Sequence, residues 1–217
     1  MKSSLALRSV CESIGAATIT SAALASSYLT DSLITQALLI GLTVTTLIHC
    51  FGRISGAHFN PVVTFFLFKD DSMRYVELFS YISAQIIGAF FSVIALKKSF
   101  FLLDNIEVDR SFHFGSTFIT EFIFTSLLLI LISSWAREGK LCPISQPLTG
   151  VVIGIGLSIF IILSEFFGSG ILNPAISIGL TFNKGTFMII PQLIGQILAV
   201  VFIKIIFYFI PENAIEN

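Results

Sequence analysis

The residues with the clearest chemical potential are two Asn-Pro pairs, Asn60-Pro61 and Asn173-Pro174. Asn is a good helix N-cap and Pro is favoured at the first helical position, so each pair predicts the start of a helix. A helix N-terminus carries about half a positive charge, and an Asn amide adds two N–H donors. Two such ends facing one site would favour an uncharged ligand that accepts hydrogen bonds.

The apolar runs around these pairs are short. They cover residues 57–68 and 170–182, whereas a helix needs about 20 apolar residues to cross a membrane. Each run therefore predicts a re-entrant half-helix. Such a half-helix lies at membrane depth only where protein or a water-filled cavity shields its ends.

The remainder of the chain has the composition of an integral membrane protein. It is 55% apolar and only 12% charged, with a mean hydropathy of +0.94, whereas soluble domains carry about 25% charged residues. These values argue against a soluble enzyme, a nucleic-acid-binding protein and a disordered chain. The net charge of −1, with no basic block, argues separately against nucleic acid as a partner.

The predicted fold class is an all-α integral membrane protein with six transmembrane helices and two half-helices in an inverted repeat. Six apolar stretches are long enough to cross the membrane as helices, at residues 10–29, 34–51, 76–96, 116–135, 147–167 and 187–210. We expect one domain over residues 1–217, with two halves at about 8–103 and 116–211.

Pairs of like residues indicate the repeat. Glu12 precedes Glu121, and Gln85 precedes Gln196, by almost the same interval that separates the two Asn-Pro pairs. Each half has three spans, an odd number, so the second half enters the membrane upside down. Inverted repeats commonly place a site at their interface near the midplane. We expect the two asparagines to meet there, in a field that repels protons and cations.

The Lys and Arg residues of the short loops favour cytoplasmic termini. With the N-terminus inside, the inner loops and N-terminal end hold seven basic residues, and the outer loops hold four, Lys97, Lys98, Arg110 and Lys184. We therefore expect a multi-pass protein of the cell membrane, plasma or inner, surrounded by lipid.

No residue pattern predicts catalysis or a cofactor. The three cysteines, Cys11, Cys50 and Cys142, lie far apart and form neither a metal-binding spacing nor a disulfide framework. The sequence contains no HExxH motif, no nucleophile–base pair and no clustered carboxylates. We expect no catalytic residue, no metal and no cofactor.

The two motifs, with the spans around them, resemble the aquaporin and aquaglyceroporin family, the major intrinsic proteins. The resemblance covers nearly the whole chain and rests on two segments, Ser55-Gly56-Ala57-His58-Phe59-Asn60-Pro61-Val62-Val63-Thr64 and Gly170-Ile171-Leu172-Asn173-Pro174-Ala175. It implies a homotetramer with one passive pore per subunit. It also implies that Glu12 and Glu121 brace the two re-entrant loops, and that His58 lines the cytoplasmic vestibule. The alternative for His58 is a hydrogen-bonded loop residue.

The sequence departs from the family pattern at the outer constriction. Family members usually carry Arg three residues after the second Asn, and this chain has Ile176. By motif spacing the other constriction positions are Ile40, Ile161 and Gly170. No side chain in this set is charged. Without the bulky Arg, and with a Gly, we expect the constriction to admit solutes larger than water. Alternatively, Ile161 and Ile176 face lipid or core.

The predicted function is a passive channel for small uncharged solutes, such as water and glycerol-like polyols. Some relatives that lack the same Arg are linked to neutral metalloid acids such as arsenite, which adds a third solute class. A water-selective channel is an alternative, because Ser177 stands where glycerol-conducting relatives usually have Asp. An alternative of another class is a structural membrane protein with a closed pore.

Overall fold

The computed structural model describes residues 3–68, 73–99, 113–135, 148–168, 170–184 and 189–209. Within these ranges all regular secondary structure is helical, and it forms eight helices. In chain order they are α1 (Leu5–Leu29), α2 (Leu33–Ser55), α3 (Pro61–Leu67), α4 (Tyr75–Ser99), α5 (Phe114–Trp135), α6 (Thr149–Glu165), α7 (Pro174–Lys184) and α8 (Ile189–Phe209). The predicted all-α class, with six long helices and two short ones, is confirmed.

The six long helices differ in length and hydropathy, and so in how well each meets the criteria for a membrane span. Among the described residues, four helices are long and apolar enough to cross by length and composition, α2, α4, α5 and α8. The helix α6 has 17 residues, slightly fewer than a full crossing needs. The helix α1 has 25 residues, but Glu12 and many Ser and Thr residues lower its hydropathy. Glu12, Thr20 and Ser26 of α1 are buried inside the bundle, so these polar groups do not face lipid.

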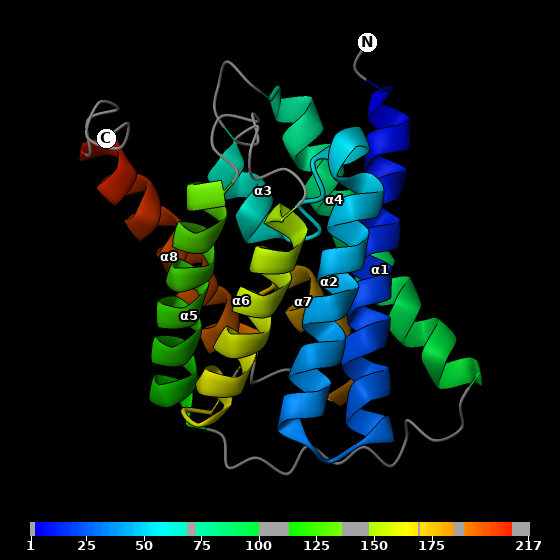
Figure 1. Ribbon diagram of the computed structural model, residues 1–217, viewed down its shortest axis with the longest axis vertical. Helices are drawn as coiled ribbons and strands as arrows, with labels where there is room; N and C mark the ends of the chain where they lie inside the picture. The colour runs from blue at the N-terminus through cyan, green and yellow to red at the C-terminus, as the bar shows by residue number, and fades with distance from the viewer. Residues whose placement is uncertain are drawn as a thin grey trace.

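The helices pack as two similar groups (Figure 1). In the first group α1 packs against α2 and α4, and in the second α5 packs against α6 and α8. The short helices α3 and α7 each contact both α4 and α8, which joins the groups. The first turn of α1 and the last turn of α8 lie at the same end of the bundle.

The helices α2 and α6 cross at two glycines. A Cβ on Gly41 would overlap the backbone oxygen of Gly154, and a Cβ on Gly154 would overlap that of Gly41. Only glycine allows so close an approach, as is common between membrane helices. Two hydrogen bonds flank the crossing in the same pattern, since Thr45 Oγ1 donates to the Gly150 oxygen at 3.0 Å. The second bond runs from Ser158 Oγ to the Ala37 oxygen at 2.9 Å.

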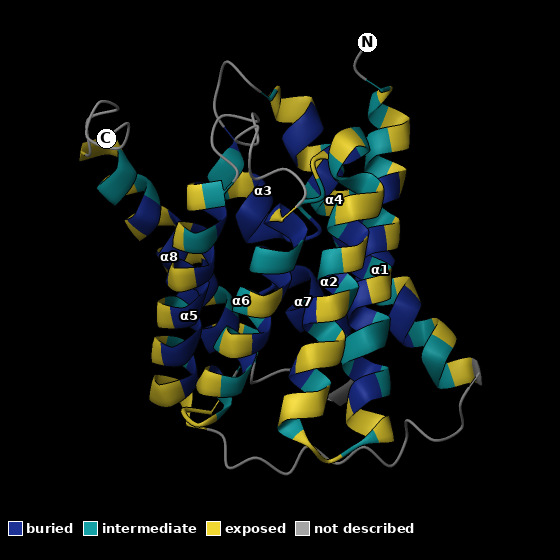
Figure 2. Ribbon diagram, in the orientation of Figure 1, coloured by how far each residue is buried: buried dark blue, intermediate teal, exposed yellow. Residues whose placement is uncertain are grey.

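Buried residues face the interior and exposed ones face outward (Figure 2). The largest apolar cluster draws on α1, α2, α3, α5, α6, α7 and α8. Many large apolar side chains on the outer faces are exposed, including Phe79, Phe91 and Phe202. An exterior this apolar fits lipid rather than water. The chain is therefore a multi-pass membrane protein whose core holds the two half-helices.

Candidate functional site

Each asparagine of the two Asn-Pro pairs caps the half-helix that follows it. Asn60 Oδ1 accepts a hydrogen bond from the backbone N–H of Val62 at 3.0 Å. Asn173 Oδ1 accepts one from the N–H of Ala175, also at 3.0 Å. A proline occupies the first position of each helix, where its missing N–H costs nothing. The cap uses the acceptor of each amide and leaves the two N–H donors.

One of those donors ties each asparagine to the opposite loop. Asn60 Nδ2 donates to the backbone oxygen of Leu172 at 2.8 Å, and Asn173 Nδ2 donates to that of Phe59 at 3.0 Å. Both asparagines are 6% exposed. Because each amide group has two N–H bonds, one donor per asparagine is left beyond these described contacts. The two half-helix N-termini therefore meet in one buried place.

The carbonyls that receive these bonds belong to two residues in the left-handed backbone region. Phe59 has φ 50° and Leu172 has φ 54°, values that are uncommon for residues other than glycine. Both side chains are almost fully buried. Strained conformations of this kind persist where surrounding contacts over-determine them, and they cluster at functional sites. Here the strained turn lies directly before each asparagine.

A buried glutamate holds the first loop. Glu12 of α1 is fully buried, and its Oε1 accepts from Ser55 Oγ at 2.6 Å and from the His58 N–H at 3.1 Å. Its Oε2 accepts from the Phe59 N–H at 2.6 Å and from Gln85 Nε2 at 2.8 Å. All four partners are donors, as an ionised carboxylate requires. These bonds fix the backbone immediately before Asn60.

A second buried glutamate holds the second loop in the same way. Glu121 of α5 is fully buried, and its Oε1 accepts from the N–H of Ile171 at 3.2 Å. Its Oε2 accepts from the N–H of Leu172 at 3.0 Å and from Gln196 Nε2 at 2.8 Å. The carboxylate therefore bonds the two residues that precede Asn173, as Glu12 does for Asn60.

Each half adds a glutamine and a hydroxyl to this arrangement. Gln85 Nε2 also donates to Thr64 Oγ1 at 2.9 Å, and Gln196 Nε2 also donates to Ser177 Oγ at 3.4 Å. The Oε1 atoms of both glutamines are buried without a hydrogen-bond partner among the described residues. A buried unpaired carbonyl costs about 1–3 kcal/mol. The unpaired glutamine oxygen occurs in both halves, so it is a feature of the repeat and not of one loop.

The first loop has further contacts around His58. The His58 ring packs edge-on against Tyr81 with 5.5 Å between ring centroids, and its Nδ1 lies 3.3 Å from Thr64 Oγ1. Tyr81 Oη donates to the Ser55 oxygen at 2.8 Å. His58 is therefore a hydrogen-bonded loop residue, and it is also partly accessible. These contacts are compatible with both interpretations of His58 from the sequence.

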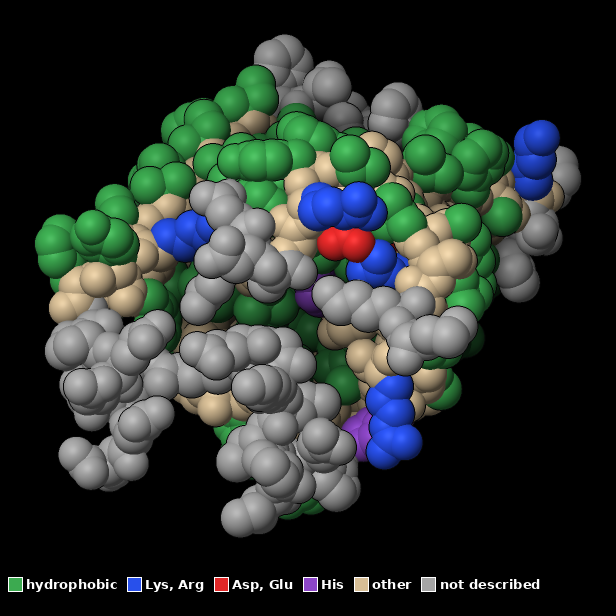
Figure 3. Space-filling model, turned by 90° about the horizontal axis from the view of Figure 1, so that it is seen from above, with side chains coloured by type: hydrophobic (Ala, Val, Ile, Leu, Met, Phe, Trp, Pro, Cys, Tyr) green, Lys and Arg blue, Asp and Glu red, His purple; other side chains and the backbone are tan. Residues whose placement is uncertain are grey.

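A largely buried ion pair lies at the end of the bundle where α1 begins. Arg8 of α1 bonds Glu77 of α4 through Nη2 and Oε1, and Glu77 Oε2 also accepts from the Arg74 N–H at 3.3 Å. Figure 3, viewed onto this end, shows an acidic side chain between basic ones beside a hollow in the surface. The ion pair joins α1 to α4, and Arg8 precedes Glu12 by four residues, about one helical turn.

The four predicted constriction residues lie in two neighbourhoods. Gly170 rests on the last turn of α6, where a Cβ would overlap Ser164 Oγ and lie 3.2 Å from the Ile161 oxygen. Ile161 and Gly170 are thus adjacent. Ile176 belongs to the main apolar cluster, and Ile40 packs against that cluster. Ile161 and Ile176 are 7% and 6% exposed.

Some residues of the site have roles that the sequence did not assign. Gln85 and Gln196 were recognisable only as a repeated pair, and Thr64, Ser177, Ser55 and Tyr81 were not predicted as partners. Thr64 and Ser177 each follow their asparagine by four residues. Extending the comparison of the halves past the Asn-Pro pairs would have found them. Nothing in the sequence indicated Tyr81, since its partner is a backbone oxygen.

Known proteins match the chain at the level of sequence. The family model described as "Major intrinsic protein" matches residues 9–187. "Aquaporin NIP3-1" of Arabidopsis thaliana is 30% identical over 152 residues, covering 66% of this chain and 46% of that protein. "Glycerol uptake facilitator protein-like 6" of Lactiplantibacillus plantarum is 33% identical over 149 residues, covering 65% and 67%. The match spans about half the length of the plant relative.

A solved structure matches the fold. The "X-ray structure of the aquaglyceroporin from Plasmodium falciparum" superposes with a TM-score of 0.74, and the match covers 98% of this chain and 99% of that one. The sequence identity is 20%, so this similarity concerns the arrangement of the helices alone.

Proposed function

Because the chain belongs to the major intrinsic protein family, we propose that it is a passive channel for small uncharged solutes, with one pore per subunit. The family consists of channels rather than enzymes, so no catalytic step is proposed. The pore passes the two asparagines at the meeting point of α3 and α7. Water and glycerol-like polyols are the proposed solutes, with neutral metalloid acids such as arsenite as a further class.

The paired asparagines are the observation that carries this proposal. Each amide caps its own half-helix and donates one N–H across to the other loop. The remaining N–H of each amide is available to an acceptor oxygen. Two helix N-termini converge there and oppose a cation. A neutral hydroxylated solute satisfies both conditions.

The breadth of solutes is proposed to follow from the outer constriction. Ile40, Ile161, Gly170 and Ile176 are proposed to form it, and their side chains offer no charge and no donor. Without a bulky guanidinium the passage admits larger solutes. Each water that passes there forgoes hydrogen bonds, at about 1–3 kcal/mol for each bond left unmade. Solute flux is therefore expected to be high relative to water flux.

The test is stopped-flow light scattering of the purified full chain in liposomes. Wild type is compared with Ile176→Arg, using water, glycerol, urea and arsenious acid, and Ile176→Val is the apolar control. Ile176→Arg is expected to lower glycerol flux by about tenfold, equivalent to about 1.4 kcal/mol of barrier, while water flux falls less. Ile176→Val should leave both unchanged.

Each outcome of this experiment decides between the alternatives. Wild-type liposomes that pass water alone would identify a water-selective channel. Liposomes that pass nothing above empty controls would favour a structural protein with a closed pore. If Ile176→Arg does not insert as folded protein, Ile176→Gln adds a polar, uncharged side chain at the same place. A wild-type solute flux that neither variant lowers would remove Ile176 from the constriction.

The remaining assignments are also proposals. We propose that residues 1–217 form a single domain, with halves at about 8–103 and 116–211, in the plasma or inner membrane with cytoplasmic termini. The basic residues of the loops support this orientation. The chain is further proposed to form a homotetramer in lipid. Glu12 and Glu121 are proposed to brace the loops, and His58 to line the cytoplasmic vestibule.

A further inference from the structure

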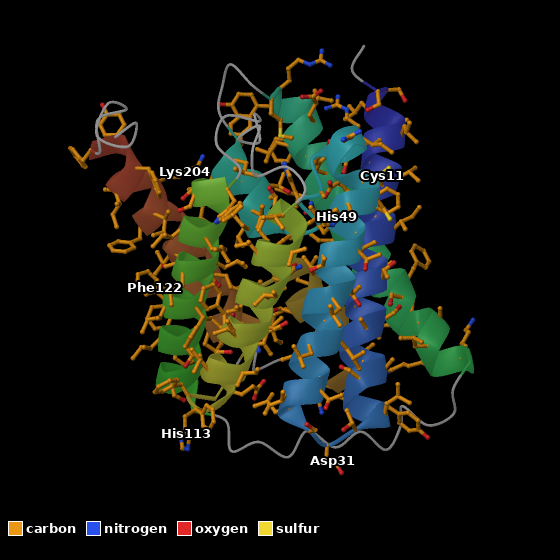
Figure 4. All side chains as sticks on the ribbon, viewed as in Figure 1. Cys11, Asp31, His49, His113, Phe122 and Lys204 are labelled. Atoms are coloured by element: carbon orange, nitrogen blue, oxygen red, sulfur yellow. The ribbon has the colours of Figure 1, made fainter. Side chains whose placement is uncertain are left out.

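A lysine of the last helix contacts the C-terminal end of the first half-helix. Lys204 of α8 donates from Nζ to the backbone oxygen of Phe68 at 3.0 Å. Phe68 is the C-cap residue that directly follows the last residue of α3. Figure 4 places Lys204 toward the end of the bundle where α8 ends. The contact joins two segments that are far apart in the sequence.

Two aromatic rings, those of Phe65 in α3 and of the C-cap residue Phe68, also lie close to the ammonium group. Lys204 Nζ lies 4.8 Å from the ring centroid of Phe65 and 5.8 Å from that of Phe68. Aromatic faces attract a cation at these distances. A lysine near the end of a membrane helix usually extends its ammonium to the lipid headgroups. Here the group donates to a backbone carbonyl and lies over two aromatic rings.

The contact matters because α3 is short. It has seven residues, and helices of that length are not stable by themselves. Its last carbonyl groups have no partner within the helix, and they carry the negative end of the helix dipole. A cation bound at the carbonyl of the C-cap residue Phe68 lies beside this end and offsets its partial negative charge. Asn60 caps the other end.

The second half-helix is held differently. Counting from the paired glutamines Gln85 and Gln196, Lys204 corresponds to Val93 of α4, a buried apolar residue. The half-helix α7 therefore has no lysine at the equivalent place of α4. It is longer, with 11 residues, and it lies close to α4, where a Cβ on Gly179 would stand 3.3 Å from Ala89.

We propose that Lys204 is a positioning residue for the pore, holding α3 at its C-terminal end so that Asn60 stays at the meeting point of the half-helices. A helix of seven residues is about 10 Å long and transmits a shift of one end to the other. Loss of the contact would release the end of α3 and misplace the Asn60 amide. The effect on permeation rests on the proposed channel function.

The test compares Lys204→Met, Lys204→Gln and Lys204→Arg with wild type in liposomes. The first removes charge and donor, the second keeps a neutral donor, and the third keeps both. Ile205→Met, on the exposed face of the same helix, is the control. Amide hydrogen exchange of residues 64–68 is measured beside glycerol flux, with residues 177–180 of α7 as internal reference.

The expected result is a graded one. Lys204→Met should speed exchange of residues 64–68 by about tenfold, the size of effect that a lost charge-assisted hydrogen bond gives, and leave α7 unchanged. Glycerol flux should fall severalfold with Met, less with Gln and by under twofold with Arg. Exchange and flux equal to wild type in Lys204→Met would overturn the proposal.

Two further outcomes are decisive. If Lys204→Met does not insert as folded protein, Lys204→Arg and Lys204→Gln carry the test, and equal exchange and flux in these two would refute the role of the charge. If wild type passes no solute, the channel proposal fails, and faster exchange in α3 alone would still support the anchoring by Lys204. Faster exchange in α3 and α7 together would mean general destabilisation and would count against the proposal.

Discussion

The loop that precedes α3 and the loop that precedes α7 are held by the same set of bonds in different surroundings. In both, a buried glutamate accepts the two backbone N–H groups before the asparagine, and a glutamine amide joins the carboxylate. In both, a left-handed residue offers its carbonyl to the opposite asparagine. These hydrogen bonds hold the two loops so that the N-termini of α3 and α7 meet.

The two groups of helices around the loops differ in chemistry. In the first, Ser9 bonds Ser80 at 2.7 Å and Ser21 bonds Ser92 at 2.8 Å, which ties α1 to α4 through hydroxyls. In the second, Phe122 of α5 lies against Phe202 of α8 with 5.4 Å between centroids, and Figure 4 marks Phe122 on the outer side of α5. Membrane helices associate through either kind of contact. Helix packing can therefore diverge while the loop bonds stay fixed.

The strongest test of this comparison removes the charge from each bracing glutamate. Glu12→Gln and Glu121→Gln each place an amide N–H against backbone N–H donors. Loss of charge-assisted bonds at fully buried positions is expected to cost about 3 kcal/mol or more in each variant. Unfolding by detergent in mixed micelles measures the change. A large loss in one variant and none in the other would show that only one loop depends on its carboxylate.

A smaller effect is expected from removing either asparagine side chain. Asn60→Ala and Asn173→Ala each remove an N-cap, worth about 1 kcal/mol, and a cross-loop hydrogen bond of similar size. We expect equal losses of about 2 kcal/mol in unfolding free energy, and a fall in glycerol flux. Asn60→Ser keeps a cap acceptor without placing a charge beside the Leu172 oxygen, so it should retain more stability than Asn60→Ala. Equal losses in these two Asn60 variants would show that the cross-loop bond, which both variants remove, dominates.

The smallest effect should separate the two loops. Tyr81→Phe removes the hydroxyl that donates to the Ser55 oxygen, a contact of the first loop only. The expected cost is about 1 kcal/mol. Hydrogen exchange should rise at residues 55–59 and stay unchanged at residues 170–172. Equal changes in both loops would mean that the cross-loop hydrogen bonds of the asparagines couple the two loops. The separate glutamate hydrogen bonds of each loop do not by themselves predict such coupling.

Much of the fold could be predicted from the sequence. The apolar runs fixed six long helices to within a few residues, because a membrane helix must be apolar over a set length. The pairs Asn60-Pro61 and Asn173-Pro174 predicted the starts of α3 and α7 correctly, since capping and first-turn preferences are local. Two spans fitted this rule less closely: α1 carries Glu12 and many Ser and Thr residues, and α6 is apolar but has only 17 residues.

The partners of the site residues could not be predicted in the same way. Tyr81 and Ser55 are joined by a bond to a backbone oxygen, which leaves no trace in residue type. In the sequence, Lys204 is a single basic residue near the end of a predicted span. It reaches Phe68 only because α8 passes beside α3. Contacts of this kind depend on where two distant segments pass one another, which no local pattern records.

The sequence by itself therefore determined the kind of protein and the residues on which its site is built: the membrane helices, the repeat, the two asparagines and the two glutamates. These follow from local helix chemistry and from the hydrocarbon thickness. Only the tertiary structure decided that each asparagine bonds the opposite loop, that a glutamine completes each glutamate, and that a lysine of α8 holds the end of α3. The physical reason is that a buried polar group must find its partner in three dimensions, wherever the packed helices provide one.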